Sequence, residues 1–232
     1  SDGNFSNELL IQTINVDLAN DLGNLVSRTT AMVGKYFGGT LPEGCGATED
    51  ELYLADLVRE GNQVVLTPTG DTVDPVLYDA QLVAMVAGLR RAYEEQMESC
   101  APHNALAEVF KVIQRANKYI DETAPWALAK DESKLPELQR VLAHLLECCA
   151  QVGFLLGCVL PEASARILSQ LQLDLCGLTP QTMAWGLVKD GHSVQAPSPV
   201  FPRILSAEEK EKMAAKAAKA AEKAARKAAR QG

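Results

Sequence analysis

The sequence predicts an all-α fold built as a bundle of helices. Apolar residues recur at helical spacing in several separate stretches, which is the pattern of helices that each bury one face. Some of these stretches open with a proline, at Pro102, Pro136 and Pro161. Proline is favoured in the first turn of a helix, where its missing N–H has no intrahelical partner. A chain of 232 residues with 47% hydrophobic content is long enough to bury a sizeable core.

The first helix is expected to run from about Asn7 to Phe37, because apolar residues recur there with steps of about 3.5 and glycines follow. The helix that opens at residue 102 should end near Tyr119, where acidic residues cluster. Thr123 would then cap a new helix whose first turn holds Pro125. The remaining expected helices cover residues 48–58, residues 74–99, a segment that begins at Pro136 and a segment that begins at Pro161.

We predict three parts along the chain. A helical bundle covers residues 1–172, and an extended strap over residues 173–206 packs back on it. The strap contains Trp185 and four prolines, which do not fit a regular helix. A basic, Ala/Lys-rich helical tail covers residues 207–232.

The tail differs in kind from the bundle. Ser206 and Glu209 form a capping-box pattern at its start, and basic residues follow at steps of three and four, so one helix face is a basic stripe. Large apolar residues are almost lacking there, so the tail cannot bury itself in a core or a membrane. Three interpretations stay open: a solvated single helix, a contact with an RNA backbone, and attachment to a further domain.

The two signs of charge are segregated. The net charge is −8, from 22 basic and 30 acidic residues, but residues 207–232 hold eight Lys or Arg against four Glu. The remainder therefore carries 14 basic and 26 acidic residues. A protein that grips a nucleic-acid backbone over a broad face needs the opposite balance, because neutralising phosphates dominates such binding. Any RNA contact by the bundle must be local, and DNA is not an expected partner.

Other protein classes are disfavoured as well. Residues 152–160, the longest apolar patch, are interrupted by glycine, and the N-terminus has no signal-peptide layout, so we expect a cytoplasmic protein without a membrane partner.

Six cysteines form no C-x-x-C pair, which indicates free buried thiols and no metal site. His103 and His144 lack ligands at metal spacing and are expected to be ordinary side chains. The sequence offers no set of a nucleophile, a general base and a residue that orients the base. No catalytic residue is therefore assigned.

Residues 116–131, which read ANKYIDETAPWALAKD, contain the main candidate for a binding surface. Pro125 gives Trp126 a stiff lead-in near the start of a helix. A flat indole held there suits stacking on another flat group, although Trp is also largely buried in most proteins. On these residues alone, Trp126 is either a core residue or a binding platform.

A line of polar side chains runs along the first helix. Asn24 and Arg28 are four residues apart and project from one face, one turn from each other, and Asp17 and Asp21 extend the line. Such a line is usually a solvated face with i,i+4 support. Gly23 costs a helix interior about 1 kcal/mol relative to Ala, which indicates the close approach of another backbone or a ligand.

The segment around Trp126 resembles N-x-Y-I-D-E-x-x-P-W-x-L-A-K, a motif of the anticodon-binding domain of bacterial-type methionyl-tRNA synthetases, which are class I aminoacyl-tRNA synthetases. Residues 15–28, NVDLANDLGNLVSR, are similar to the family's N-x-x-L-x-N-x-x-G-N-L-x-x-R helix. Residues 200–204, VFPRI, resemble its closing P-L/V-F-P-R-I. The motifs follow the family's order, and the resemblance covers about residues 1–205. It loosens at residues 158–163, CVLPEA, where members commonly read P-F-M-P-x-T.

The resemblance implies a helical-bundle anticodon-binding domain that recognises the CAU anticodon of methionine tRNA by stacking and base-edge hydrogen bonds. It assigns this role to Asn24, Arg28 and Trp126, with Pro125 supporting the ring and Lys35 as a further basic contact. It places ATP and, in some members, zinc in a catalytic domain, and residues 2–5 resemble the junction to that domain. The chain has neither an H-I-G-H-like nor a K-M-S-K-S-like motif, so we expect it to be inactive alone and to hold no cofactor.

A helical protein-interaction module with a solvated charged tail fits composition and periodicity equally well. The two interpretations differ in one geometric respect: anticodon recognition requires Asn24, Arg28 and Trp126 to converge within reach of one base. The sequence leaves the oligomeric state open.

Overall fold

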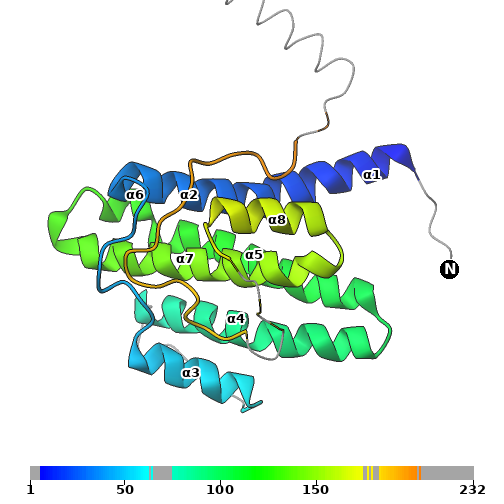
Figure 1. Cartoon of the computed structure of the whole chain (residues 1–232), viewed down its shortest axis with the longest axis horizontal. Helices are drawn as coiled ribbons and strands as arrows, with labels where there is room; N and C mark the ends of the chain where they lie inside the picture. The colour runs from blue at the N-terminus through cyan, green and yellow to red at the C-terminus, as the bar shows by residue number, and fades with distance from the viewer. Residues whose placement is uncertain are drawn as a thin grey trace, which may run out of the picture.

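The computed structural model describes residues 6–62, 64, 75–174, 177, 179, 183–202 and 204, and over these residues it is a bundle of helices joined by loops (Figure 1). This confirms the predicted all-α class. In chain order the elements are α1 (Asn7–Thr13), η1 (Ile14–Gly23), α2 (Asn24–Phe37), α3 (Glu49–Arg59), α4 (Pro75–Glu98), α5 (Pro102–Thr123), α6 (Pro125–Leu128), η2 (Glu132–Lys134), α7 (Leu135–Leu155), η3 (Leu156–Cys158) and α8 (Pro161–Gln170).

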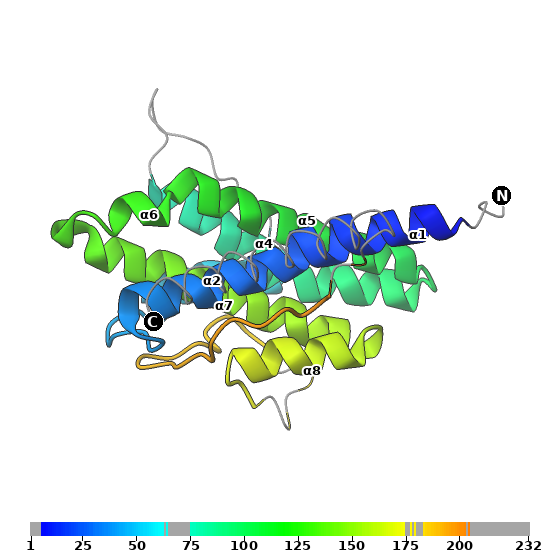
Figure 2. The same cartoon turned by 90° about the horizontal axis from the view of Figure 1, so that it is seen from above.

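The first three elements form one continuous helical segment over residues 7–37, which matches the predicted extent (Figure 2). Its middle, η1, is a π-helix, in which each N–H bonds five residues back and the turn is wider. Glycine suits position 23 of this wide turn, because the Cβ of any other residue would lie 3.2 Å from the carbonyl oxygen of Leu18, closer than a Cβ usually comes to another atom. The segment ends at Gly38, whose φ of 66° is the left-handed conformation that glycine adopts without strain.

Helix α7 is the centre of the bundle. It contacts α2, α4, α5 and α8, and nearly all of its residues from Leu138 onward are buried. The span Glu132–Cys158 is long and apolar enough to cross a membrane, but 83% of its most apolar window is buried inside the bundle. Its hydrophobicity is therefore explained by the neighbouring helices. Helices α4 and α5 form an antiparallel pair beside it, and α3 covers the outer side of α4 (Figure 1).

Helix α5 is longer than the sequence predicts. An end near Tyr119 with a new cap at Thr123 is wrong, because α5 continues to Thr123 and the Thr123 hydroxyl donates to the Tyr119 carbonyl at 2.7 Å. Glu122 stays in the helix and pairs with Arg115 at 2.7 Å. Ala124, with φ 42°, then turns the chain into the short helix α6.

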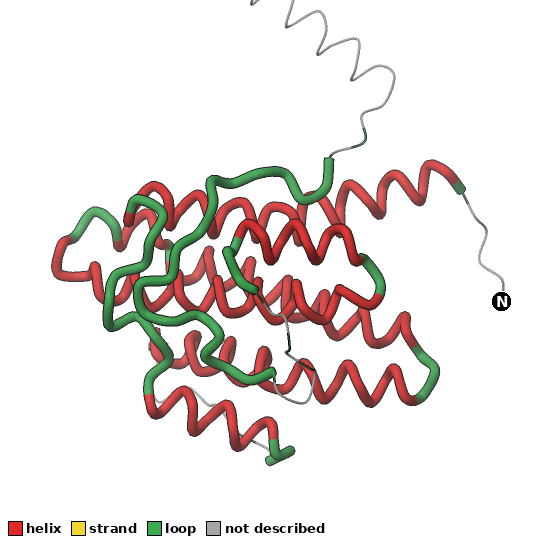
Figure 3. Tube along the Cα trace, viewed as in Figure 1, coloured by secondary structure: helices red, strands yellow, loops and turns green. Residues whose placement is uncertain are grey.

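The described part of the predicted strap, residues 183–202 and 204, crosses the bundle as an extended loop (Figure 3). Leu41 N–H donates to the His192 carbonyl, and Val194 N–H donates to the Gly39 carbonyl, each at 2.8 Å. Thr40 and Ser193 form an isolated antiparallel bridge between these bonds. The strap thereby joins the loop after α2, about 150 residues earlier in the chain.

A buried carboxylate holds the next stretch of the strap. Glu147, on α7, accepts a hydrogen bond from the Val188 N–H at 2.9 Å and one from Gln151 at 2.8 Å. Burial raises the pKa of Glu147, and its hydrogen-bond donors act in the opposite direction. Trp185 is 6% exposed, so this tryptophan is a core residue of the strap.

The five cysteines that the structure describes are free thiols. Cys45, Cys148 and Cys149 are buried as predicted, whereas Cys100 and Cys158 are exposed at helix ends. Cys176, the predicted tail over residues 207–232 and the predicted junction at residues 2–5 lie outside the described residues.

Candidate nucleic-acid interface

The outward face of α2 carries Asn24, Arg28 and Lys35. Helix α2 buries Leu25, Val26, Thr29, Thr30 and Val33 against the bundle, so the remaining positions face outward. Asn24 and Lys35 are exposed, and Arg28 is partly exposed. The helical repeat therefore places the three predicted polar residues on the accessible side, as the sequence indicates.

Trp126 lies in the first turn of α6, at the end of the bundle where α2 also ends (Figure 1). Pro125 is buried beneath it, whereas the Trp126 side chain is 45% exposed. Of the two interpretations of this residue, the exposure favours a platform and contradicts a core side chain.

One open pocket joins α2 to α6. It has a volume of about 320 Å³ and is lined by Arg28, Ala31, Met32, Lys35, Tyr36 and Trp126. Three of the predicted residues, Arg28, Lys35 and Trp126, thus share one depression. Its volume lies near the lower end of the range for ligand pockets, about 300–1,000 Å³.

Tyr36 is a residue of this pocket that sequence reasoning missed. It belongs to the apolar stripe of the first helix and therefore resembles a core residue in sequence. In the structure it is partly buried, and Lys35 Nζ lies 5.0 Å from the centre of its ring. The pocket therefore holds two aromatic rings beside two cations, the combination that suits a flat base attached to a phosphate.

Arg28 is held at the edge of the pocket by an acidic residue of α5. Its Nη2 lies 3.3 Å from Oδ1 of Asp121. Both side chains are largely accessible, so the pair is a weak surface contact that a ligand can replace. The expected i,i+4 support along the first helix is not what fixes Arg28. Burial and the neighbouring charge of Asp17 raise the pKa of Asp21, which is partly buried.

Asn24 lies one turn before Arg28 and lines a neighbouring pocket. That pocket, of about 370 Å³, lies between the first helical segment and the strap and is lined by Ala19, Asn20, Gly23, Asn24, Ser27, Pro199, Val200 and Phe201. A Cβ at Gly23 would lie 3.8 Å from the Phe201 ring, an ordinary van der Waals contact with a side chain, so the expected close approach of another backbone is not found there. The predicted residues therefore occupy two adjacent pockets of one helix face, and the expected convergence of Asn24, Arg28 and Trp126 on one base is not what these pockets provide.

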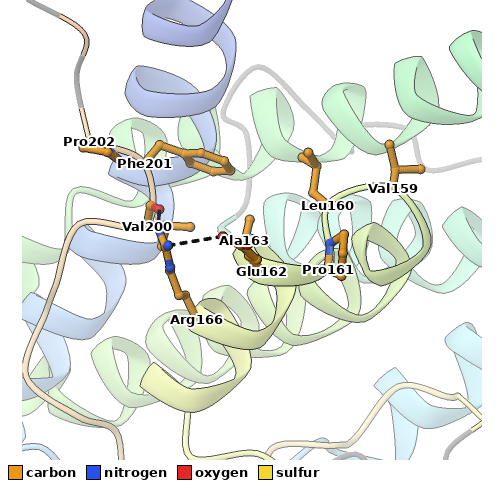
Figure 4. Close-up of a pocket in the computed structure, with 9 residues that line it drawn as sticks. All are labelled: Val159, Leu160, Pro161, Glu162, Ala163, Arg166, Val200, Phe201 and Pro202. Carbon is orange, nitrogen blue, oxygen red and sulfur yellow. Dashed lines mark hydrogen bonds and ion pairs between the residues drawn. The ribbon is translucent and has the colours of Figure 1, made fainter.

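A third cavity, of about 340 Å³, continues on the other side of the strap (Figure 4). It is lined mainly by apolar residues of the turn before α8 and by Val200, Phe201 and Pro202. Arg166 closes it, donating to the Val200 carbonyl at 3.1 Å and pairing with Glu162 at 3.5 Å. None of the sequence-predicted site residues lines this cavity.

Comparison with known families gives one match over most of the chain. Residues 68–222 match the model of the anticodon binding domain of methionyl tRNA ligase. The matched region includes Pro125 and Trp126 but begins after Asn24, Arg28 and Lys35.

Curated relatives extend the similarity to the first helix. The chain is 39% identical over 204 residues to a methionine–tRNA ligase of Caldanaerobacter subterraneus subsp. tengcongensis, and 39% identical over 204 residues to one of Clostridium tetani. These matches cover 88% of this chain but 28% and 27% of the relatives. The chain therefore spans less than one third of the length of these relatives.

Solved structures show the same relationship. Methionyl-tRNA synthetase of Mycobacterium tuberculosis matches in its free state with a TM-score of 0.69 and 27% identity, over 87% of this chain and 35% of that chain. Its complex with methionyl-adenylate matches with a TM-score of 0.67 and 28% identity, over 85% of this chain and 34% of that chain. The sequence motifs, the helical bundle and these matches agree, and the chain belongs to the family of anticodon-binding domains of methionyl-tRNA ligases.

Proposed function

We propose that this chain recognises the CAU anticodon of methionine tRNA as part of a methionine–tRNA ligase. The observation that carries the proposal is the exposed indole of Trp126 in one pocket with Arg28 and Lys35, beside a second pocket that holds Asn24. Two adjacent pockets on one helix face suit neighbouring bases of a splayed loop, which single-stranded RNA can present.

Each side chain has a distinct role in this mechanism. Trp126 stacks on a base, which contributes about 1–3 kcal/mol. The Arg28 guanidinium exchanges Asp121 for a base edge or a phosphate, and its planar fork can form two parallel hydrogen bonds. The Asn24 amide has a donor and an acceptor and can read a base edge in the adjoining pocket. Lys35 neutralises the RNA backbone, and buried Pro125 fixes the position of the ring.

The acidic composition of residues 1–206 supports selectivity. A surface with 14 basic and 26 acidic residues disfavours general RNA binding, so affinity must come from local contacts. In a complete ligase, the catalytic part would bind the acceptor end of the same tRNA and raise the effective concentration of the anticodon. We place catalysis in that part and the whole process in the cytoplasm.

The test is binding of a short stem-loop RNA with a CAU loop, compared with the same stem carrying a CAC loop, at one near-physiological salt concentration. Each RNA is titrated against the full chain and against the chain without residues 207–232. We expect a preference for CAU that persists without the tail. Equal binding of the two loops, lost with the tail, would show that the bundle does not read the anticodon and would favour the protein-interaction alternative.

A further inference from the structure

A buried polar cluster lies behind the proposed interface, and the sequence gives no indication of it. We call it the His144 cluster: Glu51 of α3, Asp79 of α4, Tyr119 of α5, and Arg140 and His144 of α7. Asp79, Tyr119 and His144 are buried, with 5%, 0% and 3% exposure. Burying so many polar groups is unfavourable unless they satisfy one another, so their partners decide their protonation.

The hydrogen bonds show which atoms carry protons. The Tyr119 hydroxyl donates its one proton to Asp79 Oδ1, and Arg140 Nε donates to Asp79 Oδ2 at 2.8 Å, as expected for a carboxylate. His144 Nδ1, 3.2 Å from the Tyr119 oxygen, must then donate to it. His144 Nε2 faces Glu51 Oε1 at 2.9 Å and donates to that carboxylate. This arrangement of partners suits an imidazolium, which has a proton on each ring nitrogen.

The charges within the cluster balance. Glu51 and Asp79 supply two negative charges, and Arg140 and His144 supply two positive charges. Burial disfavours the charged ring, but the hydrogen bonds and charges of the two carboxylates outweigh it and raise the pKa of His144 above 6.5. Burial also opposes ionisation of Asp79 and Glu51, yet His144 holds the pKa of each below its usual value.

Other groups face His144 from the strap side. Glu147, Cys45 and Trp185 line a void of about 10 Å³ beside it, which is too small to hold a water readily. The Trp185 ring centre lies 5.6 Å from that of His144. On the opposite side, Glu51, Asp79 and Arg140 line a cavity of about 200 Å³ between α3 and α4.

The cluster is connected to the interface through the last turns of α5. The Tyr119 hydroxyl is bound in the cluster, and the Tyr119 carbonyl accepts the Thr123 hydroxyl at 2.7 Å. Trp126 follows three residues after Thr123, just beyond the end of α5. The side chain of Tyr119 therefore anchors the end of the helix that leads to the indole.

We propose that His144 is a positioning residue for the anticodon interface: its imidazolium joins Glu51 and Asp79, fixes the end of α5 through Tyr119, and makes the orientation of Trp126 depend on one buried proton. This inference rests on the proposed function for its effect on RNA, but its effect on Trp126 does not require RNA. His144 touches no RNA in this arrangement and acts through Tyr119 alone.

The first test observes Trp126 directly. Protein labelled with 5-fluorotryptophan gives a fluorine NMR signal for each of its two tryptophans, Trp126 and Trp185. We expect the Trp126 signal to shift or split as the pH rises through the titration of His144, and in His144→Gln to stay at all pH values where the wild-type signal lies at high pH. His103→Gln, which changes an exposed histidine on α5, is the matched control and should leave the signal unchanged.

A second variant separates positioning from loss of fold. Tyr119→Phe retains the ring but removes the hydroxyl that links the cluster to α5. It should alter the Trp126 signal while the His144 ring still titrates, as followed by proton–nitrogen NMR of the imidazoles. A His144 pKa at or below 6.5, or a Trp126 signal that ignores both variants and pH, would overturn the proposal.

The last test measures the effect on RNA. At about pH 6, His144→Gln should weaken binding of the CAU stem-loop about tenfold, and the ratio to wild type should approach one well above the His144 pKa, where neither protein holds the charge. A ratio that does not change with pH would indicate a structural defect and contradict positioning by the proton. If wild type fails to bind the CAU loop at every pH while the fluorine signal still follows His144, the proposed function fails and the positioning role stands.

Discussion

Arg28 of α2 and Asp121 of α5 form an ion pair, with 3.3 Å between Nη2 and Oδ1, at the edge of the pocket that contains Trp126. A ligand that takes the guanidinium must break this pair. Asp121→Asn keeps the side-chain shape but releases Arg28 and removes a negative charge. We expect binding of both CAU and CAC stem-loops to strengthen about two- to fivefold, the range of a surface ion pair.

The control for this change is Asp56→Asn, which removes an exposed carboxylate of α3 far along the chain. It should alter affinity much less at the same ionic strength. The gain from Asp121→Asn should also shrink as salt is added, because surface charges are screened. Weaker RNA binding by Asp121→Asn would show that Asp121 orients Arg28 rather than competing for it.

Trp126→Ala should weaken CAU stem-loop binding by between about 5-fold and about 100-fold, because one stacking interaction is removed. The midpoint of thermal unfolding should change little, since the ring is 45% exposed and Pro125 retains its buried position. Tyr53→Ala, which removes an aromatic side chain 68% exposed on α3, should leave RNA binding unchanged. A large fall in the unfolding midpoint of Trp126→Ala would mean that the ring is part of the core.

The free energy of unfolding should be greatest at an intermediate pH and should fall on both the acid and the alkaline side. Asp79 and Glu51 have lowered pKa values when folded, so their stabilisation is present above their unfolded pKa and is lost as the pH falls through the folded values. His144 has a raised pKa, so its stabilisation is complete below 6.5 and is lost as the pH rises through the folded value. Urea unfolding measured over these pH values should show the free energy of unfolding falling on both sides. His144→Gln should reduce the fall on the alkaline side.

Gly23→Ala and Gly34→Ala should have opposite effects on stability. Gly34 has no atom within 4 Å of its Cβ position, so alanine should raise the free energy of unfolding by about 0.5–1 kcal/mol through helix propensity. At Gly23 a Cβ would lie 3.2 Å from the Leu18 carbonyl, which is backbone and cannot rotate away. We expect a loss of stability there, measured by urea unfolding. A gain at both positions would show that the π-helical turn relaxes freely.

Asn15→Ala should release the end of the strap. The Asn15 amide donates to the Ile204 carbonyl and accepts from the Ile204 N–H, both at 2.9 Å. Each of these bonds contributes about 1 kcal/mol, so hydrogen exchange at the Ile204 amide should accelerate at least several-fold. Gln12→Ala, at an exposed position of α1, should leave this exchange rate unaltered.

Sequence patterns predicted the helices well where local chemistry determines them. Proline at residues 102, 136 and 161 and glycine at residue 38 mark helix ends that the structure confirms. The sequence places the end of α5 too early because Asp121 pairs with Arg28 of α2, a contact that local sequence does not reveal, and because Glu122 pairs with Arg115 and Lys118 within α5 itself. The sequence also does not predict the π-helix over residues 14–23. Ile14, Leu18 and Leu22 fit a period of 3.6 residues as well as a wider one. The partner of Asn15 is Ile204, 189 positions away in the chain.

The sequence predicts which side of the helix the candidate residues occupy, but not the shape of the pockets they line. Helical spacing placed Asn24 and Arg28 on one face, but their division between two pockets depends on the strap, whose Phe201 forms a wall beside Gly23. Neither Tyr36 nor His144 stands out in the sequence, because an apolar stripe and an isolated histidine carry no local signal. His144 acquires its role from Glu51, 93 residues earlier, and from Asp79.

The strap also constrains the order in which the molecule is built. Its partners Leu41 and Asn15 are synthesised before residues 183–204. Contacts between such distant segments form slowly, because a long loop must close before they stabilise anything. We expect α2, α5 and α7 to assemble on the nascent chain and the strap to dock last. The Trp126 pocket is therefore complete before the Asn24 pocket, which gains its second wall once residues 199–201 have been made.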